Sequence, residues 1–380
     1  MPDAALAAEA TQPLTASAAK QRFHFVDLFR GLLMAHMALD HVSLFFNAQK
    51  FGHEVAHGPM PVPADFWQFI TRFTGVFVAP GFSFMAGFMI AVTSERRAGR
   101  GLDEGAITRR LLLRGLILIA AEALLLQVPA LLLKITHRYG FEVLACLGVS
   151  MMIVAFIRRW PTAVLAPLAL AILVLHPLIP AAPDAGPLAV VGRLLHDTRS
   201  MPYFAVLYPV IPWVAVMLLG FVTGRAFQRK PEAGRWIAAA LVFAALFVLV
   251  RLRGGYGNAY PYDRVASYAF FTWAKYPPDL AWLTWSFMTI FAVLALLWRF
   301  QDSRALASRP AEFVATFGRT PFFFYLLHFE LLGLAAIAVG KGPLWRVYAI
   351  WAGLLGLLWW PCRAYAAYKK RHPESMWKYL

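Results

Sequence analysis

Long apolar stretches recur along this chain, and they limit its fold more than any other feature. Each is about 20 residues long, which is enough for a helix to cross a bilayer. Hydrophobic residues make up 60% of the sequence, whereas a soluble domain is closer to about half apolar. Because lipid offers no water to unpaired backbone groups, the sequence predicts an all-α fold, a polytopic bundle of transmembrane helices.

About ten candidate spans can be placed within residues 22–363. They cover approximately residues 25–46, 65–93, 109–132, 139–157, 162–180, 203–224, 235–251, 281–299, 313–338 and 343–363. An even number of spans places both termini on the same side of the membrane. Lys and Arg are about twice as frequent in the segments on that side as in the opposite loops, so the positive-inside rule predicts cytoplasmic N- and C-termini.

The segments outside the spans carry less information. Residues 1–21 are Ala-rich and polar and lack the apolar core of a signal peptide, so a disordered tail is predicted there. Residues 22–363 form one predicted transmembrane domain, and residues 364–380 form a basic tail suited to an anionic membrane surface. The formal net charge is +16, but the basic residues lie between apolar spans, which favours membrane topology over nucleic-acid binding.

The first span carries ionisable residues, among them Asp27, Arg30 and His41. Such groups are costly in an apolar span, so they usually face the bundle interior or a water-filled cavity. At about 100° per residue, these three lie within roughly 60° of one another on a helix. Arg30 and His41 are separated by about 16 Å along the axis. We therefore expect one polar face of this helix to line a passage between the two aqueous compartments.

Each of these residues has a structural and a functional interpretation. Asp27 and Arg30 have the i, i+3 spacing of a local ion pair, but Arg30 could also bind an anionic ligand from the cytoplasm, since its fork suits phosphate. His41 could be a hydrogen-bonded core histidine. Alternatively, it could be the general base or the nucleophile of a group transfer. Its place on the same face as Arg30 favours the functional interpretation.

Further charged residues lie in the later spans. Arg72, Arg114 and Glu122 are predicted to be buried, and an interhelical ion pair is the simplest role for each. Arg114 could also belong to a cytoplasmic funnel for anions. The ninth span begins near Arg319 and contains His328 close to its middle, where the imidazole could face the first helix.

The loop after the first span contains His53-Glu54-Val55-Ala56-His57, which matches the H-E-x-x-H motif of metalloproteases. In those enzymes the motif lies on a helix, so that both histidines share a face and bind zinc. Glycines flank the motif here, so a polar outer loop is the favoured interpretation and no metal is expected. His53 and His57 remain candidates for substrate chemistry because they lie near the outer end of the first span.

The order and spacing of several motifs resemble one bacterial integral-membrane family. It is the family similar to the catalytic domain of heparan-alpha-glucosaminide N-acetyltransferase, and the start of the chain also resembles the wider acyltransferase-3 group. The matching stretches are Asp27-x-x-Arg30-Gly31, Met37, Asp40-His41, VFVAPGFSFMAGFMIA, RRLLLRGLILIAAE and FGRTPFFFYLLHFELL.

The resemblance implies acyl transfer across a bacterial inner membrane. Acetyl-CoA would bind from the cytoplasm, and a carbohydrate or glycolipid on the far side would accept the acetyl group on a hydroxyl or amine; a homo-oligomer is an open alternative to a monomer. Arg30 and His41 match the Arg-Gly and His of the acyltransferase-3 pattern. In the animal acetyltransferase the proposed acetyl-carrying histidine lies in the loop after the first helix, which corresponds by order to His53 or His57.

These considerations give two sets of candidate site residues. The catalytic candidates are His41, His53, His57 and His328. The candidates for binding the acetyl-CoA donor are Asp27, Arg30, Arg72, Arg114 and Arg319.

Two other functions fit parts of the sequence. A secondary transporter for an anionic or lipid-linked solute would use the buried Arg and His side chains as its binding site, although the sequence shows no paired half-chains. An intramembrane metalloprotease would use His53 and His57 as zinc ligands. No P-loop and no G-x-S-x-G motif occurs, so the sequence gives no support to nucleotide hydrolysis or to a serine hydrolase.

Overall fold

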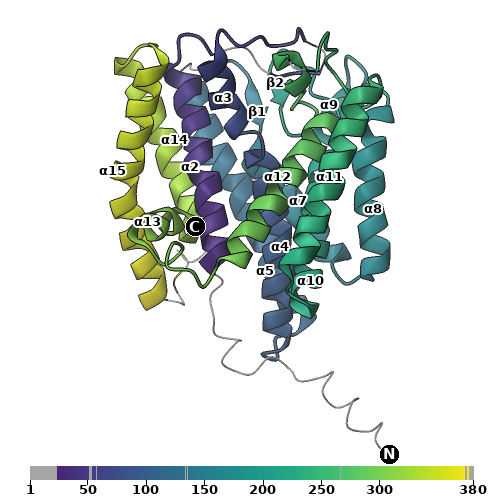
Figure 1. Ribbon diagram of the computed structural model, residues 1–380, viewed down its shortest axis with the longest axis vertical. Coiled ribbons are helices and arrows are strands. Elements are labelled where there is room, and N and C mark those ends of the chain that lie inside the picture. The colour runs from purple at the N-terminus through teal and green to yellow at the C-terminus, as the bar shows by residue number, and fades with distance from the viewer. Residues whose placement is uncertain are drawn as a thin grey trace, which may run out of the picture.

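The structure, a computed structural model, describes residues 24–50, 54–56, 58–132, 134, 136–265, 267–372 and 375. The predicted tail at residues 1–21 lies outside these ranges, as do the candidate histidines His53 and His57. The described chain is mostly helical and forms a bundle of long helices that run between two ends (Figure 1). The predicted all-α class is therefore confirmed.

Helices occupy most of each predicted span, but residues 65–93 are divided between two helices, and the spans at 139–157 and 203–224 each begin with a short strand. Those of the first half are α2 (His24–Phe46), α3 (Phe66–Thr74), α4 (Val78–Ala98), α5 (Glu104–Ala121), the π-helix η3 (Glu122–Gln127), α6 (Val128–Leu132) and α7 (Val143–Ile157). Those of the second half are α8 (Thr162–Leu175), the 3₁₀-helix η4 (His176–Leu178), α9 (Pro187–Leu195), α10 (Val210–Arg229), α11 (Ala233–Arg253), the 3₁₀-helix η5 (Tyr268–Phe271), α12 (Leu280–Arg299), α13 (Arg309–Arg319), α14 (Pro321–Ala338) and α15 (Leu344–Arg371). Two short parallel strands, β1 (Tyr139–Phe141) and β2 (Phe204–Val206), pair with Tyr139 opposite Phe204.

Among the described residues, 6 stretches are long and apolar enough to cross a membrane. They are Phe66–Ala98, Glu104–Leu132, Val210–Arg229, Ala233–Arg253, Leu280–Arg299 and Pro321–Ala338. Two shorter apolar helical stretches, Val143–Ile157 and Thr162–Leu178, accompany them. Helix α2 has the length of a span, at 23 residues, but its ionisable residues make it less apolar. The length and composition of these helices support an integral membrane protein, as predicted.

The two ends of the bundle differ in their connections. Helix α2 begins at the lower end in Figure 1, and α13 lies near that end. The upper end holds α3, α9 and the two strands, together with the long connections between helices (Figure 1). These long connections are the loops that the sequence assigns to the outside, so the lower end is the one that the positive-inside rule assigns to the cytoplasm. We use "lower" and "upper" in this sense below.

Helix α2 occupies a central place in the bundle. It packs against α13, α14 and α15, and also against α4 and α12. Its lower half buries Phe25, Phe29 and Leu33 in one hydrophobic cluster, and its upper half buries Leu39 and Val42 in a second. Because protein surrounds α2 on most sides, its ionisable side chains can face other helices rather than lipid, as burial of charge requires.

The predicted ninth span, residues 313–338, is not one helix. Helix α13 ends at Arg319, and α14 begins at Pro321. A proline has no N–H to donate and its ring clashes with the preceding turn, so a continuous helix through this point is disfavoured. The break lets α13 cross α2 at a separate angle, while α14 continues as the span.

Two glycines make the crossing of α2 and α13 possible. A Cβ atom on Gly318 would lie 1.8 Å from the backbone oxygen of Asp27, and one on Gly31 would lie 2.1 Å from the backbone oxygen of Val314. Only glycine, which has no side chain, lets the two helix backbones come this close. The glycine of the Arg30-Gly31 pair is therefore explained by helix packing.

Among the described residues, the buried Glu122 has no interhelical ion pair of the kind that the sequence suggested. Its carboxylate accepts hydrogen bonds from the backbone N–H groups of Glu142, Leu144 and Ala145, at 2.8, 2.9 and 3.0 Å. The first N–H groups of a helix have no partner within the helix and favour a negative charge. Glu122 therefore caps the start of α7 from the π-helical turn η3.

Candidate active site

Three cavities follow one another along α2. The lower cavity, of about 190 Å³, contains Arg30 and Arg114. The middle cavity, of about 60 Å³, contains His41. The upper cavity, of about 210 Å³, contains Lys50 and Glu54. Arg30 and His41 therefore line two different cavities along the same helix.

Shared side chains join the three cavities. Phe82, Val143 and Tyr325 line both the lower and the middle cavity. Asp40, Lys275 and Tyr276 line both the middle and the upper cavity. The small middle cavity is thus bounded by bulky side chains below and by polar side chains above.

The lower cavity combines two cations with an apolar wall. Arg30 comes from α2 and Arg114 from α5, so the two guanidinium groups approach the cavity from different helices. The wall that they face is formed mainly by Met34, Phe82, Met85, Ala86, Met89, Ile90, Leu111, Leu118, Val143, Leu144, Leu147, Met151, Pro321 and Phe322. Such a site suits a ligand with an anionic head and a flexible apolar arm, because arginine binds phosphate and methionine adapts to irregular shapes.

His41, in the wall of the middle cavity, stacks on the buried His328. His41 Nδ1 lies 2.8 Å from His328 Nε2, and the two rings are nearly parallel, at 8° with centroids 5.1 Å apart. Tyr325 and Phe329 from α14 contact the His41 ring edge-on. Helices α2 and α14 therefore bring together two histidines that are far apart in the sequence.

The hydrogen bonds of this pair determine which nitrogen carries a proton. His328 Nδ1 lies 3.0 Å from the backbone oxygen of Phe324, which can only accept, so Nδ1 donates. A neutral imidazole has one N–H, so His328 Nε2 must accept, and His41 Nδ1 donates to it. His41 Nε2 is then left with a lone pair. This arrangement makes His41 Nε2 the basic, nucleophilic atom of the pair.

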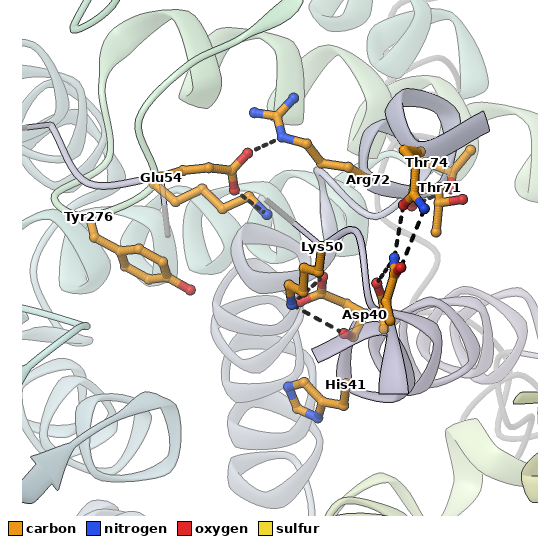
Figure 2. Close-up of polar contacts among 12 residues, drawn as sticks. Asp40, His41, Lys50, Glu54, Thr71, Arg72, Thr74 and Tyr276 are labelled. Carbon is orange, nitrogen blue, oxygen red and sulfur yellow. Dashed lines mark hydrogen bonds and ion pairs between the residues drawn. The ribbon is translucent and has the colours of Figure 1, made fainter. Parts of the chain in front are cut away.

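The upper cavity is polar and contains a buried carboxylate between two cations. Arg72 Nε pairs with one oxygen of Glu54, and Lys275 Nζ lies 2.8 Å from the other. Figure 2 shows Arg72 reaching Glu54, while Lys50 reaches Asp40 beside His41 and the hydroxyl of Tyr276 points toward the same space. The backbone N–H groups of Lys275 and Tyr276 donate hydrogen bonds to the backbone oxygen of Glu54, and these bonds hold the two loops together.

The charge state of Glu54 is fixed by these neighbours. Burial alone would raise the pKa of Glu54, but Arg72 and Lys275 hold the pKa of that carboxyl below its ordinary value of 4.5. The pair therefore contributes stability that is fully present above about pH 4.5 and is lost as the pH falls through the lower pKa of the folded protein.

We expect acid to destabilise the wild type through Glu54. The melting temperature in detergent should fall below about pH 4.5, and Glu54→Gln should remove part of that fall. At pH 7 the same change should destabilise the protein by about 3–5 kcal/mol, because Arg72 and Lys275 lose their buried partner. Asp302→Asn, an exposed carboxylate at the lower end, is the matched control. An unchanged pH profile in Glu54→Gln would contradict the assignment.

The structure groups some of the predicted site residues and separates others. Arg30 and Arg114 share the lower cavity, and His41 contacts His328. Asp27 lies 3.5 Å from Arg319 Nε, so the ion pair that Asp27 forms here reaches α13. Arg319 also pairs with Glu312, another residue of α13. Asp27 and Arg319 thus join α2 to α13 next to the glycine crossing.

Arg72 lies away from the other predicted donor-binding residues. It lines the upper cavity, at the opposite end from Arg30 and Arg114, where it is paired with Glu54. The described part of the H-E-x-x-H motif, Glu54–Ala56, is not helical, because Val55 forms a bridge with Tyr276 and Ala56 lies in a turn. The metalloprotease interpretation therefore loses the helix that it requires.

Sequence reasoning missed several residues that line the middle and upper cavities. Lys50, Lys275 and Tyr276 come from two outer loops, and Tyr325 lies one turn before His328 on α14. One available signal was that the outer loops are long and rich in aromatic residues, as functional loops tend to be. The position of Tyr325 at i−3 from His328 would also have placed it on the same helix face.

The sequence of this protein matches a known family. The family model described as heparan-alpha-glucosaminide N-acetyltransferase, catalytic, matches residues 22–254. The chain belongs to this family. No curated protein matches the chain. As a member of the heparan-alpha-glucosaminide N-acetyltransferase family with long apolar helices, the protein is an integral membrane transferase.

The matched range covers most of the lower cavity and His41. It includes α2, α4, α5 and α7, which supply Arg30, Arg114 and His41. His328, Lys275 and Tyr276 lie beyond residue 254 and thus outside the match. The heparan-alpha-glucosaminide N-acetyltransferase family uses acetyl-CoA as its donor in general. The match therefore bears on the part of the chain that surrounds the cationic cavity.

Proposed function

We propose that the protein is a transmembrane acetyltransferase of the bacterial inner membrane. It takes the acetyl group of acetyl-CoA at the lower, cytoplasmic end and passes it to an amine or hydroxyl of a sugar-like acceptor at the upper end. The observation that supports this proposal best is the His41–His328 pair, which lies between an apolar cavity with two arginines and a polar cavity.

The lower cavity is the proposed donor site. Arg30 and Arg114 would bind phosphate groups of acetyl-CoA, since guanidinium groups donate two parallel hydrogen bonds to such oxygens. The methionine-rich wall would hold the long pantetheine arm, and the arm would carry the thioester toward Tyr325 and the middle cavity. Binding of this kind places the reacting carbonyl close to His41 and lowers the entropic part of the barrier.

His41 Nε2 can act on the thioester in either of two ways. As a general base it removes the proton of the acceptor amine or hydroxyl, which attacks the carbonyl while the carbon–sulfur bond breaks and the CoA thiolate leaves. As a nucleophile it attacks the carbonyl itself, the carbon–sulfur bond breaks and the CoA thiolate leaves. The acceptor then attacks the acetyl group, the bond from the acetyl group to Nε2 breaks, and Nε2 takes up the proton of the acceptor. In both routes His328 and the Phe324 carbonyl keep the Nδ1 proton of His41 in place.

The upper cavity is the proposed acceptor site. Its wall carries hydroxyl, amide, ammonium and carboxylate groups from Ser43, Asn47, Lys50, Glu54, Gln68, Thr71, Arg72, Lys275, Tyr276 and Lys341. Side chains of these types recognise the hydroxyl and amine groups of sugars through directed hydrogen bonds. The acceptor could reach His41 from this side past Asp40 and Tyr276.

We expect Arg30→Gln and Arg114→Gln each to weaken acetyl-CoA binding by about tenfold, since each removes a charge-assisted hydrogen bond to phosphate. Isothermal titration calorimetry of the full chain in detergent measures this directly. Arg304→Gln, an exposed arginine at the same end of the bundle, should bind acetyl-CoA as the wild type does.

Two results would speak against the proposed function. If the wild-type protein does not bind acetyl-CoA, the lower cavity is not the donor site. Solute flux in proteoliposomes without turnover of labelled acetyl-CoA would support the transporter interpretation instead.

A further inference from the structure

A fourth cavity lies at the lower end, on another face of α4. It has a volume of about 260 Å³, and we name it the Ser94 cavity. Its wall is formed by Ala91, Ser94, Glu95, Ala98, Glu104, Arg158, Arg159, Phe221 and Arg225. The lower cavity uses Met89, Ile90 and Thr93 of the same helix, so the body of α4 separates the two cavities.

Two buried side chains in the wall of this cavity each have one donor atom that is unused among the described residues. Ser94 is 6% exposed and Arg158 is 5% exposed. Within the described part of the chain, Ser94 Oγ and Arg158 Nε have no hydrogen-bond partner. Buried polar atoms are nearly always hydrogen-bonded, and an unmet one costs about 1–3 kcal/mol. Two unmet donors in one cavity indicate that a ligand with acceptor oxygens completes the site.

The charge around the cavity favours an anion. Arg158, Arg159 and Arg225 outnumber Glu95 and Glu104. Glu104 already forms an ion pair with Arg158. Glu95 lies in the attractive field of Arg225 and of the nearby Arg229. Arg159 is exposed and forms no ion pair among the described residues, which leaves its guanidinium group available to a ligand.

The remaining arginines are held in place by the protein itself. Arg158 donates to the backbone oxygen of Glu104 at 3.1 Å and to Thr108 Oγ1 at 3.2 Å. Arg225 donates to the backbone oxygen of Trp160 at 2.8 Å and stacks on Phe221. A preorganised set of cations binds an anion without a further entropic cost for ordering the side chains.

We propose that the Ser94 cavity binds a phosphate group at the lower end of the bundle. A phosphate has the oxygens that Ser94 Oγ and Arg158 Nε lack, and Arg159 would supply a third contact. Such a group can come from the head group of an anionic phospholipid or from a soluble phosphate compound. The proposal does not depend on the acetyltransferase chemistry, because α4 separates the two cavities.

Binding by the full chain in detergent tests the proposal. The probes are inorganic phosphate, followed by calorimetry, and phosphatidylglycerol, followed by native mass spectrometry, with diacylglycerol as the lipid that lacks phosphate. The double variant Ser94→Ala/Arg159→Gln should weaken binding of the phosphate-bearing probe by at least about tenfold. Arg304→Gln is the matched control and should bind as the wild type does.

The two probes, inorganic phosphate and phosphatidylglycerol, also distinguish the two sources of the phosphate group. Variant-sensitive binding of phosphatidylglycerol but not of inorganic phosphate assigns the site to a membrane lipid, and the reverse assigns it to a soluble compound. Equal affinities in the wild type and in the double variant for both probes would overturn the proposal. Because the double variant changes one small side chain and one exposed one, its melting temperature should stay within about 2 °C of the wild type.

Discussion

His41→Ala should lower acetyl transfer from labelled acetyl-CoA by about a thousandfold, while acetyl-CoA binding changes little. The change removes Nε2, the atom that the hydrogen bonds to His328 and Phe324 leave as the base, and positioned general bases contribute about 10²–10⁴-fold to a rate. Single-turnover kinetics of the full chain in detergent separates this chemical step from donor binding.

His36→Ala is the matched control for this experiment. His36 lies on the same helix, and its Nδ1 donates to the backbone oxygen of Leu32 at 2.9 Å, so its loss should leave turnover near that of the wild type. Full turnover in His41→Ala together with its loss in His53→Ala or His57→Ala would transfer the catalytic role to the loop after α2.

His328 should act through His41 rather than directly. His328→Gln retains an acceptor that can hold the His41 Nδ1 proton, so it should keep more activity than His328→Ala. The two variants should differ in kcat more than in the KM for acetyl-CoA, because the lower cavity is untouched. Equal kcat values for the two variants would contradict this positioning role.

Gly318→Ala should destabilise the protein by about 3 kcal/mol or more. The added Cβ would lie 1.8 Å from the backbone oxygen of Asp27, and a backbone atom cannot turn aside as a flexible side chain can. Helices α2 and α13 would have to move apart, and overpacking of this kind costs about 1–3 kcal/mol or more. Thermal unfolding of the full chain in detergent measures the loss.

Gly333→Ala is the matched control for this substitution. Gly333 lies within α14, and a Cβ atom there would meet nothing within 4 Å. Because alanine favours a helix over glycine by about 1 kcal/mol, Gly333→Ala should leave the melting temperature unchanged or raise it. A Gly318→Ala protein as stable as the wild type would show that the two helices can separate without cost.

The sequence predicted those parts of the site that depend on a single helix. Arg30 and His41 each line a cavity along α2, and the free-energy cost of an ionisable side chain in an apolar span predicted that both face inward. The spacing along α2 needed no knowledge of the other helices. The same reasoning placed the spans, since each one is a local apolar pattern.

The partners of these residues could not be predicted in the same way. His328 meets His41 across 287 residues of sequence, and Arg319 reaches Asp27 only because α13 separates from α14 at Pro321. Glu54 was expected in a polar outer loop, and the arginine on α3 and the lysine of a distant loop that neutralise it could not be named from the sequence. Each of these contacts depends on how helices pack, which no local pattern contains.

The middle cavity also bears on the permeability of the membrane. Its volume of about 60 Å³ is much smaller than the 190 and 210 Å³ of its neighbours, and it has room for only a few water molecules. On the proposed function, only the two-carbon acetyl end of the donor would have to enter this small space, while the nucleotide stays in the lower cavity. The small volume and the bulky side chains between the lower and middle cavities would then limit any water-filled path across the membrane.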